Sequence, residues 1–298
     1  MKVLVTGTSG QLGYDVMEEL LKRGHEAIGA DRSGGEGEFK KVKLDITDAA
    51  KVDEIIDELK PDAIVHCAAW TNVDGAEAPE NLEKVRAVNV TGTKNLAEAS
   101  KKVDAKFVYI STDYVFNGEG SEPWQADDKN YAPINVYGQS KLDGEKEVTQ
   151  ILDKYFIVRI AWVFGRNGKN FVKTMLEVGA KHEMVKVVDD QIGTPTYTYD
   201  LARLLVDMIE SDKYGYYHAT NEGGFISWAD FTEEIFKQAR INSKVERVST
   251  EEYEKIAGKT VAKRPFNSRL DKSKLVEAGF EPLPTWQDAL RRYLEEIK

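Results

Sequence analysis

Residues 2–13, Lys2-Val-Leu-Val-Thr-Gly-Thr-Ser-Gly-Gln-Leu-Gly13, decide the fold because they join an apolar strand to a helix through three glycines. Residues 2–7 form a short β-branched, apolar run, which is typical of a buried parallel strand. Gly7, Gly10 and Gly13 follow, and apolar residues then recur at helical spacing up to residue 22. Such a turn offers bare backbone N–H groups and a positive helix end, which predicts a diphosphate site. A glycine-rich turn without a ligand is the alternative.

The next strand, residues 26–31, ends in an acid about 20 residues after the glycines. Asp31 can accept hydrogen bonds from the ribose hydroxyls of an adenosine, which favours NAD because a 2′-phosphate would meet a like charge. Arg32 and Ser33 follow at once and could hold a 2′-phosphate if Asp31 swings aside. The choice between NADH and NADPH therefore stays open. Residues 33–38, rich in glycine, are expected to form a short mobile loop.

Residues 42–46 predict a third strand that ends in Asp45 and Ile46. A polar residue followed by an apolar one at a strand exit suits the edge and the face of an adenine ring. The alternative is local: Thr47 or Asp48 would cap the helix expected at 49–60, and Asp45 would only support that cap.

A fourth strand is expected at residues 61–69, and its last residues, Ala68 and Ala69, are small enough to let a cofactor approach the backbone. Trp70 then opens a loop. A helix is expected over residues 80–102, and Asn89 lies on or near its apolar face. A buried amide needs a partner, which we expect to be a strand carbonyl or a water.

The fifth strand, residues 106–112, completes an alternation of strands and helices that predicts a doubly wound parallel sheet, the Rossmann type of α/β fold. Ligands bind such a sheet beyond the carboxyl ends of its strands, where Gly10, Asp31, Ala68 and Thr112 all fall. The hydroxyl of Thr112 could bind a substrate oxygen or simply satisfy the strand end; spacing does not decide between the two.

Tyr137 and Lys141 stand four residues apart on a helix expected at 134–150, so they share one face. A neighbouring cation favours the phenolate, and we therefore expect Lys141 to lower the pKa of Tyr137 and to prepare it for proton transfer near neutral pH. The alternative is an exposed tyrosine and a solvated lysine on a surface helix.

The remaining chain is less regular. We expect residues 1–165, with a return segment at about 196–220, to form the dinucleotide-binding domain, and 166–298 to form most of a smaller α/β substrate lobe. The expected elements are strands at 155–162, 185–188 and 214–220, helices at 171–176, 198–210, 227–239 and 286–297, and a loop at 191–196. Residues 263–269 are locally basic and could grip a phosphate, or could be an ordinary surface loop.

Composition excludes several classes of function. The 298 residues carry a formal net charge of −10, so attraction to nucleic acid or to an anionic membrane is not expected. Cys67 is the only cysteine, which rules out an intrachain disulfide, and the four histidines show no metal-ligand spacing. With no long apolar run, we expect a soluble protein of a reducing compartment, the cytoplasm, without a resident metal.

Taken together, the motifs resemble the dTDP-4-dehydrorhamnose reductase family of the extended short-chain dehydrogenase/reductases. The resemblance rests on motifs in order along almost the whole chain: the glycine turn, Ser111-Thr-Asp-Tyr-Val-Phe116, Asn135-Val-Tyr-Gly-Gln-Ser-Lys141, Asn170-Phe-Val-Lys-Thr-Met175, Asp190-Gln-Ile-Gly-Thr-Pro-Thr196 and Arg264-Pro-Phe-Asn-Ser-Arg-Leu270.

The resemblance implies reduction of a 4-keto nucleotide sugar to dTDP-L-rhamnose with hydride from NADPH or NADH. Tyr137 would protonate the oxygen, Lys141 would hold the nicotinamide ribose, and Thr112 would orient the keto group. It also implies a cofactor site and a sugar site. The cofactor residues would be Gly7, Gly10, Gln11, Leu12, Gly13, Asp31, Arg32, Asp45, Ile46, Ala68, Ala69, Trp70, Tyr137 and Lys141. The substrate residues would be Thr112, Asp113, Tyr114, Trp162 and Arg264.

Three points qualify the resemblance. Related sugar dehydratases carry glutamate where this chain has Tyr114, which favours simple reduction. Trp70 replaces the usual Tyr or His, and Arg159-Ile-Ala-Trp162 replaces the usual Arg-Thr-Ser-Trp, so the sugar fit could differ. Some members use Mg²⁺ at a dimer interface, and Asp15 falls near one such position, but the sequence does not support a full ligand set.

Two other functions stay open. One is a non-catalytic dinucleotide-binding subunit of the methionine adenosyltransferase type. The other is a reductase or epimerase of another nucleotide-deoxysugar. The resemblance also implies a dTDP-sugar partner and a possible homodimer.

Overall fold

A seven-stranded parallel sheet forms the centre of the protein, as seen in a computed structural model that describes residues 1–33, 39–257 and 262–298. The predicted doubly wound fold is confirmed. From one edge of the sheet to the other the strands are β11 (Gly215–His218), β6 (Tyr155–Ile160), β5 (Lys106–Thr112), β4 (Ala63–His66), β1 (Lys2–Thr6), β2 (Glu26–Asp31) and β3 (Lys41–Lys43). The loop predicted at 33–38 lies, apart from Ser33, outside the described residues.

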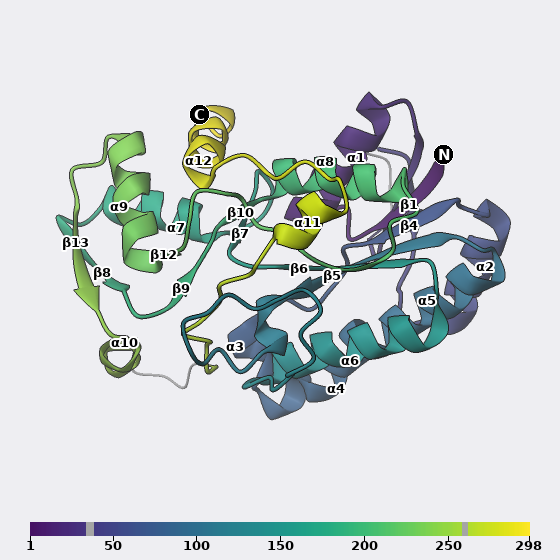
Figure 1. Cartoon of the computed structure of the whole chain (residues 1–298), viewed down its shortest axis with the longest axis horizontal. Coiled ribbons are helices and arrows are strands. Elements are labelled where there is room, and N and C mark those ends of the chain that lie inside the picture. The colour runs from purple at the N-terminus through teal and green to yellow at the C-terminus, as the bar shows by residue number, and fades with distance from the viewer. Residues whose placement is uncertain (34–38, 258–261) are drawn as a thin grey trace.

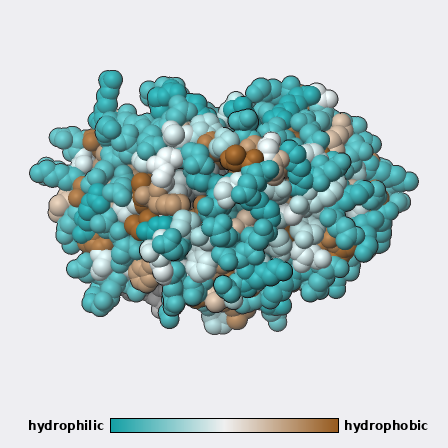
Figure 2. All heavy atoms as spheres, viewed as in Figure 1, coloured by the Kyte–Doolittle hydropathy of each residue, from teal (hydrophilic) through white to brown (hydrophobic). Residues whose placement is uncertain are grey.

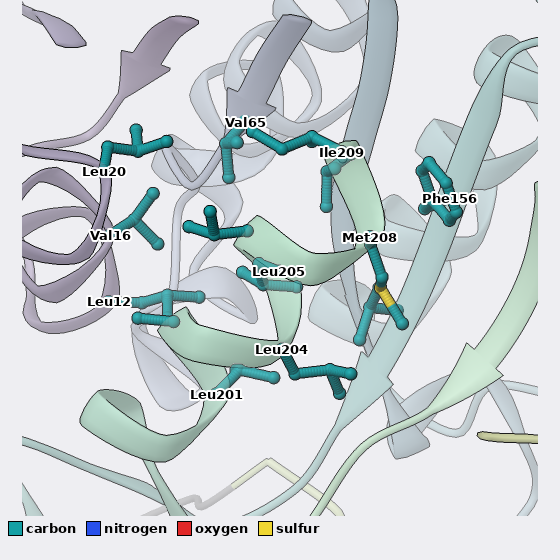
Figure 3. Packing of buried hydrophobic residues seen from close by; sticks show 14 of the residues in the cluster. Leu12, Val16, Leu20, Val65, Phe156, Leu201, Leu204, Leu205, Met208 and Ile209 are labelled. Carbon is teal, nitrogen blue, oxygen red and sulfur yellow. The ribbon is translucent and has the colours of Figure 1, made fainter. Parts of the chain in front are cut away.

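Helices cover both faces of the sheet (Figure 1). One face packs on α1 (Gln11–Lys22) and α8 (Thr198–Ile209), and the other on α2 (Ala49–Leu59), α5 (Thr93–Lys102) and α6 (Val136–Ile151). The side chains of β1 alternate between these layers: Val3 and Val5 join the cluster of α1 and α8, and Leu4 joins that of α2 and α5. In Figure 3, α1 and α8 pack through leucine and valine side chains that point at one another.

The stretch predicted as one helix at 80–102 is helical throughout but not uniform. It runs through a 3₁₀ turn (Pro79–Asn81), α4 (Leu82–Arg86), a π-helical segment (Ala87–Gly92) and α5. A π-helical turn widens the spiral by one residue and often marks a functional position. Here it contains Asn89, which is fully buried.

Several predicted boundaries were too wide. The strands predicted at 42–46, 61–69, 155–162 and 214–220 are shorter, and Asp45 and Ile46 lie in the turn after β3 instead of at its last residue. The helix predicted at 134–150 is α6, which Asn135 caps by accepting from the N–H of Gly138.

The C-terminal part adds a second core beside the sheet, on the left of Figure 1. Its helices are α7 (Phe171–Gly179), α9 (Trp228–Ala239) and α12 (Trp286–Glu296), and α10 (Thr250–Ala257) contacts β8 (Met184–Val188), whereas α11 (Ser273–Glu277) packs on the central core through Leu275. Three two-stranded pairs join it: β7 (Val163–Phe164) with β10 (Thr196–Tyr197), β9 (Ile192–Gly193) with β12 (Ile226–Ser227), and β8 (Met184–Val188) with β13 (Lys244–Val248).

Sequence patterns were less informative in this part. The loop predicted at 191–196 contains two short strands, and β13, α10 and α11 were not predicted. The helix predicted at 227–239 is α9, which Ser227 and Asp230 cap through a reciprocal capping box.

The face seen in Figure 2 is mostly hydrophilic, with isolated hydrophobic residues between charged ones. Within the described part of the chain, no helix is long and apolar enough to span a bilayer.

Candidate active site

The glycine turn between β1 and α1 leaves no room for side chains. Gly7 has φ of +73°, and a Cβ atom there would lie 2.7 Å from the backbone nitrogen of Ala68. A Cβ atom on Gly13 would lie 2.3 Å from the carbonyl oxygen of Gly7. Gly10 stands at the N-cap of α1 without a side chain to cover the helix end. This bare, tightly packed turn fits a diphosphate. The next residues, Gln11 and Leu12, form the first turn of α1.

Asp31, at the end of β2, faces this same turn. Its Oδ2 atom accepts hydrogen bonds from the backbone N–H of Ser9 at 2.6 Å and from the hydroxyl of Thr8 at 3.1 Å. Asp31 is thus held at the glycine turn, next to where the predicted ribose would lie. Arg32 beside it is exposed.

Asp45 and Ile46 play local structural roles in the turn before α2. Asp45 accepts from the N–H and the hydroxyl of Thr47, which lowers its pKa, while Asp48 caps the helix by accepting from the N–H of Lys51 at 3.0 Å. Ile46 is buried. The cap predicted as the alternative is confirmed for Asp48, and the adenine contact of Asp45 and Ile46 stays a prediction.

Asn89 holds in place the backbone of the segment after β4, residues 68–70, where the cofactor is expected to approach. Ala68 donates its N–H to the Thr6 hydroxyl at 3.2 Å, and Ala69 lies between Ala68 and Trp70. The Asn89 side chain accepts from the N–H of Trp70 at 2.7 Å and donates to the Trp70 carbonyl at 3.1 Å. It also donates to the Ser140 hydroxyl of α6 at 2.9 Å. The prediction that Asn89 bonds a strand carbonyl or a water was wrong, because its partners are the backbone of Trp70 and the Ser140 hydroxyl in the helix of Tyr137.

Tyr137 meets the end of β5 at the first turn of α6. Its ring packs edge-on against the ring of Tyr114, with centroids 5.8 Å apart. A hydrogen bond joins Tyr137 to Thr112 and lowers the pKa of the phenol, but burial, the largest effect, and the nearby Asp113 raise it well above its usual value. The predicted lowering by Lys141 was therefore wrong: burial dominates, and the phenol stays protonated at neutral pH.

Lys141 is buried one turn along from Tyr137. Its Nζ atom lies 4.0 Å from the centre of the Tyr109 ring. Burial lowers the pKa of Lys141 to about 7, whereas Glu145 raises it. The alternative of an exposed tyrosine and a solvated lysine is wrong, since Tyr137 is half-buried and Lys141 is only 3% exposed.

Thr112, Asp113 and Tyr114 turn sharply out of β5. The Thr112 hydroxyl donates to Asp113 at 3.0 Å and accepts from the N–H of Tyr114 at 3.2 Å. Burial raises the pKa of Asp113 to about 6, although hydrogen bonds from Ser268 and Thr112 lower it. Burial, with Asp113 adding to it, also raises the pKa of Tyr114. The turn thus places an alcohol and two weakly acidic groups beside Tyr137.

Trp162 has an unusual backbone for its size. Its φ is +51°, a left-handed conformation that is rare for a bulky residue. Its ring stacks on Trp228 of α9, with centroids 3.7 Å apart and planes 14° from parallel. The C-terminal core therefore fixes where this ring lies.

Arg264 is held by an acid of the sheet domain. Its guanidinium lies 2.9 Å from Asp74 of α3 (Val73–Ala76) and donates to the carbonyl of Ala262. In the basic segment 263–269, Arg269 donates to the side chain of Asn267 at 3.0 Å. The predicted phosphate contact of Arg264 stays a prediction.

Sequence reasoning missed residues that support the site from behind. Arg159 of β6 and Glu145 of α6 form a fully buried ion pair, and Trp228 supports Trp162. Only Glu145 had a sequence signal, its four-residue spacing from Lys141. The others meet the site through contacts between distant segments.

Asp15, noted for a possible Mg²⁺, lies in α1 with 3% exposure. Burial raises its pKa to about 7; a hydrogen bond with Thr198 lowers it, and Glu296 and Glu18 raise it further. Within residues 1–33, 39–257 and 262–298, no three His, Cys, Asp or Glu side chains are grouped so that they could hold a metal ion. Metal dependence stays a prediction.

Comparison with known proteins agrees with this geometry. The family model described as the RmlD substrate binding domain matches residues 1–298. A dTDP-4-dehydrorhamnose reductase of Aggregatibacter actinomycetemcomitans is 38% identical, with 97% of each chain covered. A dTDP-4-keto-6-deoxy-D-glucose reductase of Streptomyces niveus is 36% identical, covering 96% of this chain and 94% of the relative. The crystal structure of dTDP-4-dehydrorhamnose reductase from Bacillus anthracis in complex with NADP is 40% identical, with a TM-score of 0.90 over 100% of this chain and 99% of the other.

Proposed function

Because this chain belongs to the RmlD family of dTDP-4-dehydrorhamnose reductases, we propose that it reduces the C4 keto group of dTDP-4-dehydro-L-rhamnose to give dTDP-L-rhamnose. The observation that carries the proposal is that Tyr137, in the first turn of α6, packs against Tyr114 beside Thr112 at the end of β5, at the sheet edge that also holds the glycine turn. Lys141 lies one turn further along α6. These three side chains are the ones that ketone reduction needs.

The cofactor would lie along this edge, held by the residues that the sequence singled out. Gly7, Gly10 and Gly13 offer the close approach that a diphosphate requires, Asp31 and Arg32 stand at the end of β2, and Ala68 follows β4. The other proposed contacts are those of Gln11, Leu12, Asp45, Ile46, Ala69, Trp70, Tyr137 and Lys141. When bound, the reduced nicotinamide supplies the hydride that adds to C4 of the sugar.

Tyr137 supplies the proton. Since burial keeps its phenol protonated at neutral pH, Tyr137 is in the form that can donate to the carbonyl oxygen as negative charge grows there. The hydroxyl of Thr112 would hold the same oxygen in place. The C4 carbon then gains a hydrogen and the oxygen gains the proton, so the ketone becomes an alcohol. Lys141 would bind the nicotinamide ribose beside Tyr137.

The sugar would contact the residues around the end of β5. Asp113 and Tyr114 turn toward this edge, and Trp162 presents an aromatic face fixed by Trp228. Arg264 would bind the diphosphate, for which it would have to exchange its present ion pair with Asp74. Tyr114 cannot serve as the acid that a sugar dehydratase uses, which supports reduction without loss of water.

We propose NADPH as the preferred cofactor. Asp31 is already held by Ser9 and Thr8, which turns its charge toward the glycine turn, and Arg32 beside it is exposed and free to meet a 2′-phosphate. The similarity to an NADP complex supports the same choice.

Domain division, assembly and location are part of the proposal. Residues 1–165 with the return segment at about 196–220 would bind the dinucleotide, and residues 166–298 would form most of the substrate lobe. The path of the chain supports this, because β11 rejoins the central sheet after α8. We propose a cytoplasmic protein, supported by its single cysteine, and a homodimer, which size-exclusion chromatography with light scattering would test.

A second candidate keeps the chemistry and changes the sugar. The relative named as a dTDP-4-keto-6-deoxy-D-glucose reductase is nearly as similar as the rhamnose enzyme of Aggregatibacter, and this similarity makes a keto sugar of the other series the second candidate substrate class. A non-catalytic dinucleotide-binding subunit is less well supported. The residues that reduction requires, Thr112, Tyr137 and Lys141, are all present and lie together at the end of β5 and the start of α6.

The decisive experiment supplies each keto sugar with NADPH or NADH and follows loss of reduced nicotinamide at 340 nm, with the product identified by mass spectrometry and NMR. We expect turnover with the L-sugar and a higher kcat/KM with NADPH. Turnover only with the D-sugar would establish the second candidate. Tight NADPH binding with no turnover of either sugar would favour the binding subunit.

A further inference from the structure

A buried ion pair lies directly behind the proposed catalytic helix. Arg159 of β6 donates from Nε to Glu145 Oε1 at 2.9 Å and from Nη2 to Oε2 at 2.8 Å, so two parallel hydrogen bonds join the pair. Their side chains are 0% and 1% exposed. A buried pair contributes little net stability because both charges lose their water. Its presence here calls for another role.

Glu145 connects the two chain segments that carry the proposed catalytic groups. It lies four residues after Lys141 on the same face of α6, and both are buried. Its Oε1 atom also accepts from the hydroxyl of Ser111 at 2.5 Å, and Ser111 immediately precedes Thr112 in β5. One carboxylate therefore holds α6 against the end of β5.

Arg159 extends the same connection to the long segment between β5 and α6. Its guanidinium donates to the carbonyl of Ala126 at 3.2 Å and to the hydroxyl of Tyr131 at 2.9 Å. Rings surround it: its carbon centre lies 5.0 Å from the Phe116 ring centre and 4.7 Å from that of Tyr216. This segment ends at the cap of α6. The ion pair therefore contacts both the end of β5 and the segment that leads into the helix of Tyr137.

We propose that Glu145, anchored by Arg159, is a positioning residue that keeps Lys141 charged and in place within its buried site. The proposal rests on the proposed function, in which Lys141 binds the nicotinamide ribose as a cation. It adds a residue that touches neither substrate nor cofactor and acts only through Lys141.

The groups that face Lys141 leave Glu145 as the source of negative charge. On β4 and just after it, burial lowers the pKa of His66 to about 3 and raises that of Cys67 to about 12, so both are neutral at pH 7. Burial likewise raises the pKa of Tyr109 on β5 and of Tyr137 on α6, so both phenols are neutral. Within the described chain, Glu145 is the carboxylate that opposes the effect of burial on Lys141.

The test measures NADPH affinity from pH 5.5 to 9 by fluorescence titration of the full chain, since binding needs no sugar. In the wild type we expect affinity to fall as Lys141 loses its proton near pH 7. The pH at which half of this fall has occurred is the midpoint that the variants should shift. Glu145→Gln removes the negative charge and leaves Arg159 unpaired, so the midpoint should move down by about one pH unit or more, and NADPH should bind roughly fivefold more weakly at pH 7.

Arg159→Met provides a test of opposite sign. It leaves Glu145 facing Lys141 without its partner, so the midpoint should move up. The double variant replaces the whole pair with neutral groups, which buried sites often tolerate, and should fold even where a single variant does not. Because Glu145 lies one turn from Lys141, the double variant should keep a midpoint below that of the wild type.

Asp200→Asn is the matched control. Asp200 has a fully buried side chain that Arg292 holds through two hydrogen bonds of 2.8 and 2.7 Å, so the variant breaks a comparable pair in another part of the fold. It should lower stability and leave the midpoint unchanged. Equal midpoints in wild type, Glu145→Gln and the double variant would overturn the proposal. Absence of sugar turnover in the wild type, with the midpoints shifting as described, would overturn only the proposed function.

Discussion

The Nζ atom of Lys141 lies 4.0 Å from the centre of the Tyr109 ring, and the Tyr109 hydroxyl donates to the Lys141 carbonyl at 3.2 Å. Strand β5 therefore holds both ends of this residue. The ammonium rests on the negative face of the ring, which offsets part of the loss of water. Lys141 is thus fixed beside Tyr137 without lowering the pKa of the phenol, which separates their two roles.

Tyr137→Phe tests the role of the phenol. Removing the hydroxyl takes away the proton donor and leaves the ring in contact with Tyr114, so kcat should fall by about 10²–10⁴-fold. NADPH affinity should change far less than kcat, because the phenol is one of many proposed cofactor contacts. Steady-state assays and NADPH titration measure both. Tyr214→Phe, which removes a hydroxyl bonded to Asp212 near β11, should keep full activity. If Tyr137→Phe retained more than a tenth of kcat, another group would be the donor.

Gly7→Ala and Gly24→Ala separate backbone strain from crowding. Both glycines have left-handed φ values, +73° and +79°, so both variants should lose about 1 kcal/mol of unfolding free energy. Only at Gly7 would the new Cβ atom meet backbone, that of Ala68, while nothing lies within 4 Å at Gly24. Urea unfolding should therefore show a larger loss for Gly7→Ala, and NADPH titration should show weaker binding for that variant alone. Equal losses would mean that the turn can relax.

The sequence predicted which edge of the sheet carries the proposed site, because that prediction needs only local patterns. Strand and helix periods, the glycine spacing and the four-residue spacing of Tyr137 and Lys141 placed the proposed site residues at one edge, and Asp48 was recognisable as a cap. Each of these signals lies within a few residues of chain.

Contacts between distant segments were beyond such patterns. Arg159 and Glu145 meet because β6 packs beneath α6, and Trp162 meets Trp228 across 66 residues of sequence. The direction of the Tyr137 pKa was predicted wrongly for a related reason. Spacing shows the neighbouring charge of Lys141, whereas the larger effect, burial, depends on how much of the fold covers the ring.

Asp15 should make stability depend on pH. Its pKa in the folded chain is about 7, against an ordinary value of 3.8. Between pH 4 and 7 the folded state holds a proton that the unfolded chain has lost, so raising the pH lowers stability, by on the order of a few kcal/mol in total. Above pH 7 the effect is constant.

Asp15→Asn removes this titration, so the variant should gain stability relative to the wild type as pH rises from 4 to 7. Urea unfolding at half-unit intervals would show the gap between the two proteins widening over that window. Parallel pH profiles would show that Asp15 keeps an ordinary pKa in the folded chain.

Trp162 combines an aromatic platform with a left-handed backbone, and two substitutions separate these features. Trp162→Gly and Trp162→Ala both remove the ring that stacks on Trp228, but only glycine adopts a φ of +51° freely. Urea unfolding should therefore find the alanine variant less stable than the glycine variant by about 1 kcal/mol, the reverse of their usual order.

If the ring contacts the sugar, both variants should lose kcat/KM for the sugar to a similar extent while NADPH affinity stays at the wild-type level. If the strained backbone matters more to the reaction than the ring, the alanine variant should be much less active than the glycine variant. Kinetics with the dTDP-sugar varied at saturating NADPH decide between a role of the ring and a role of the backbone. Loss of a sugar contact raises KM in both variants, because both lack the ring, whereas an effect of the backbone separates alanine from glycine.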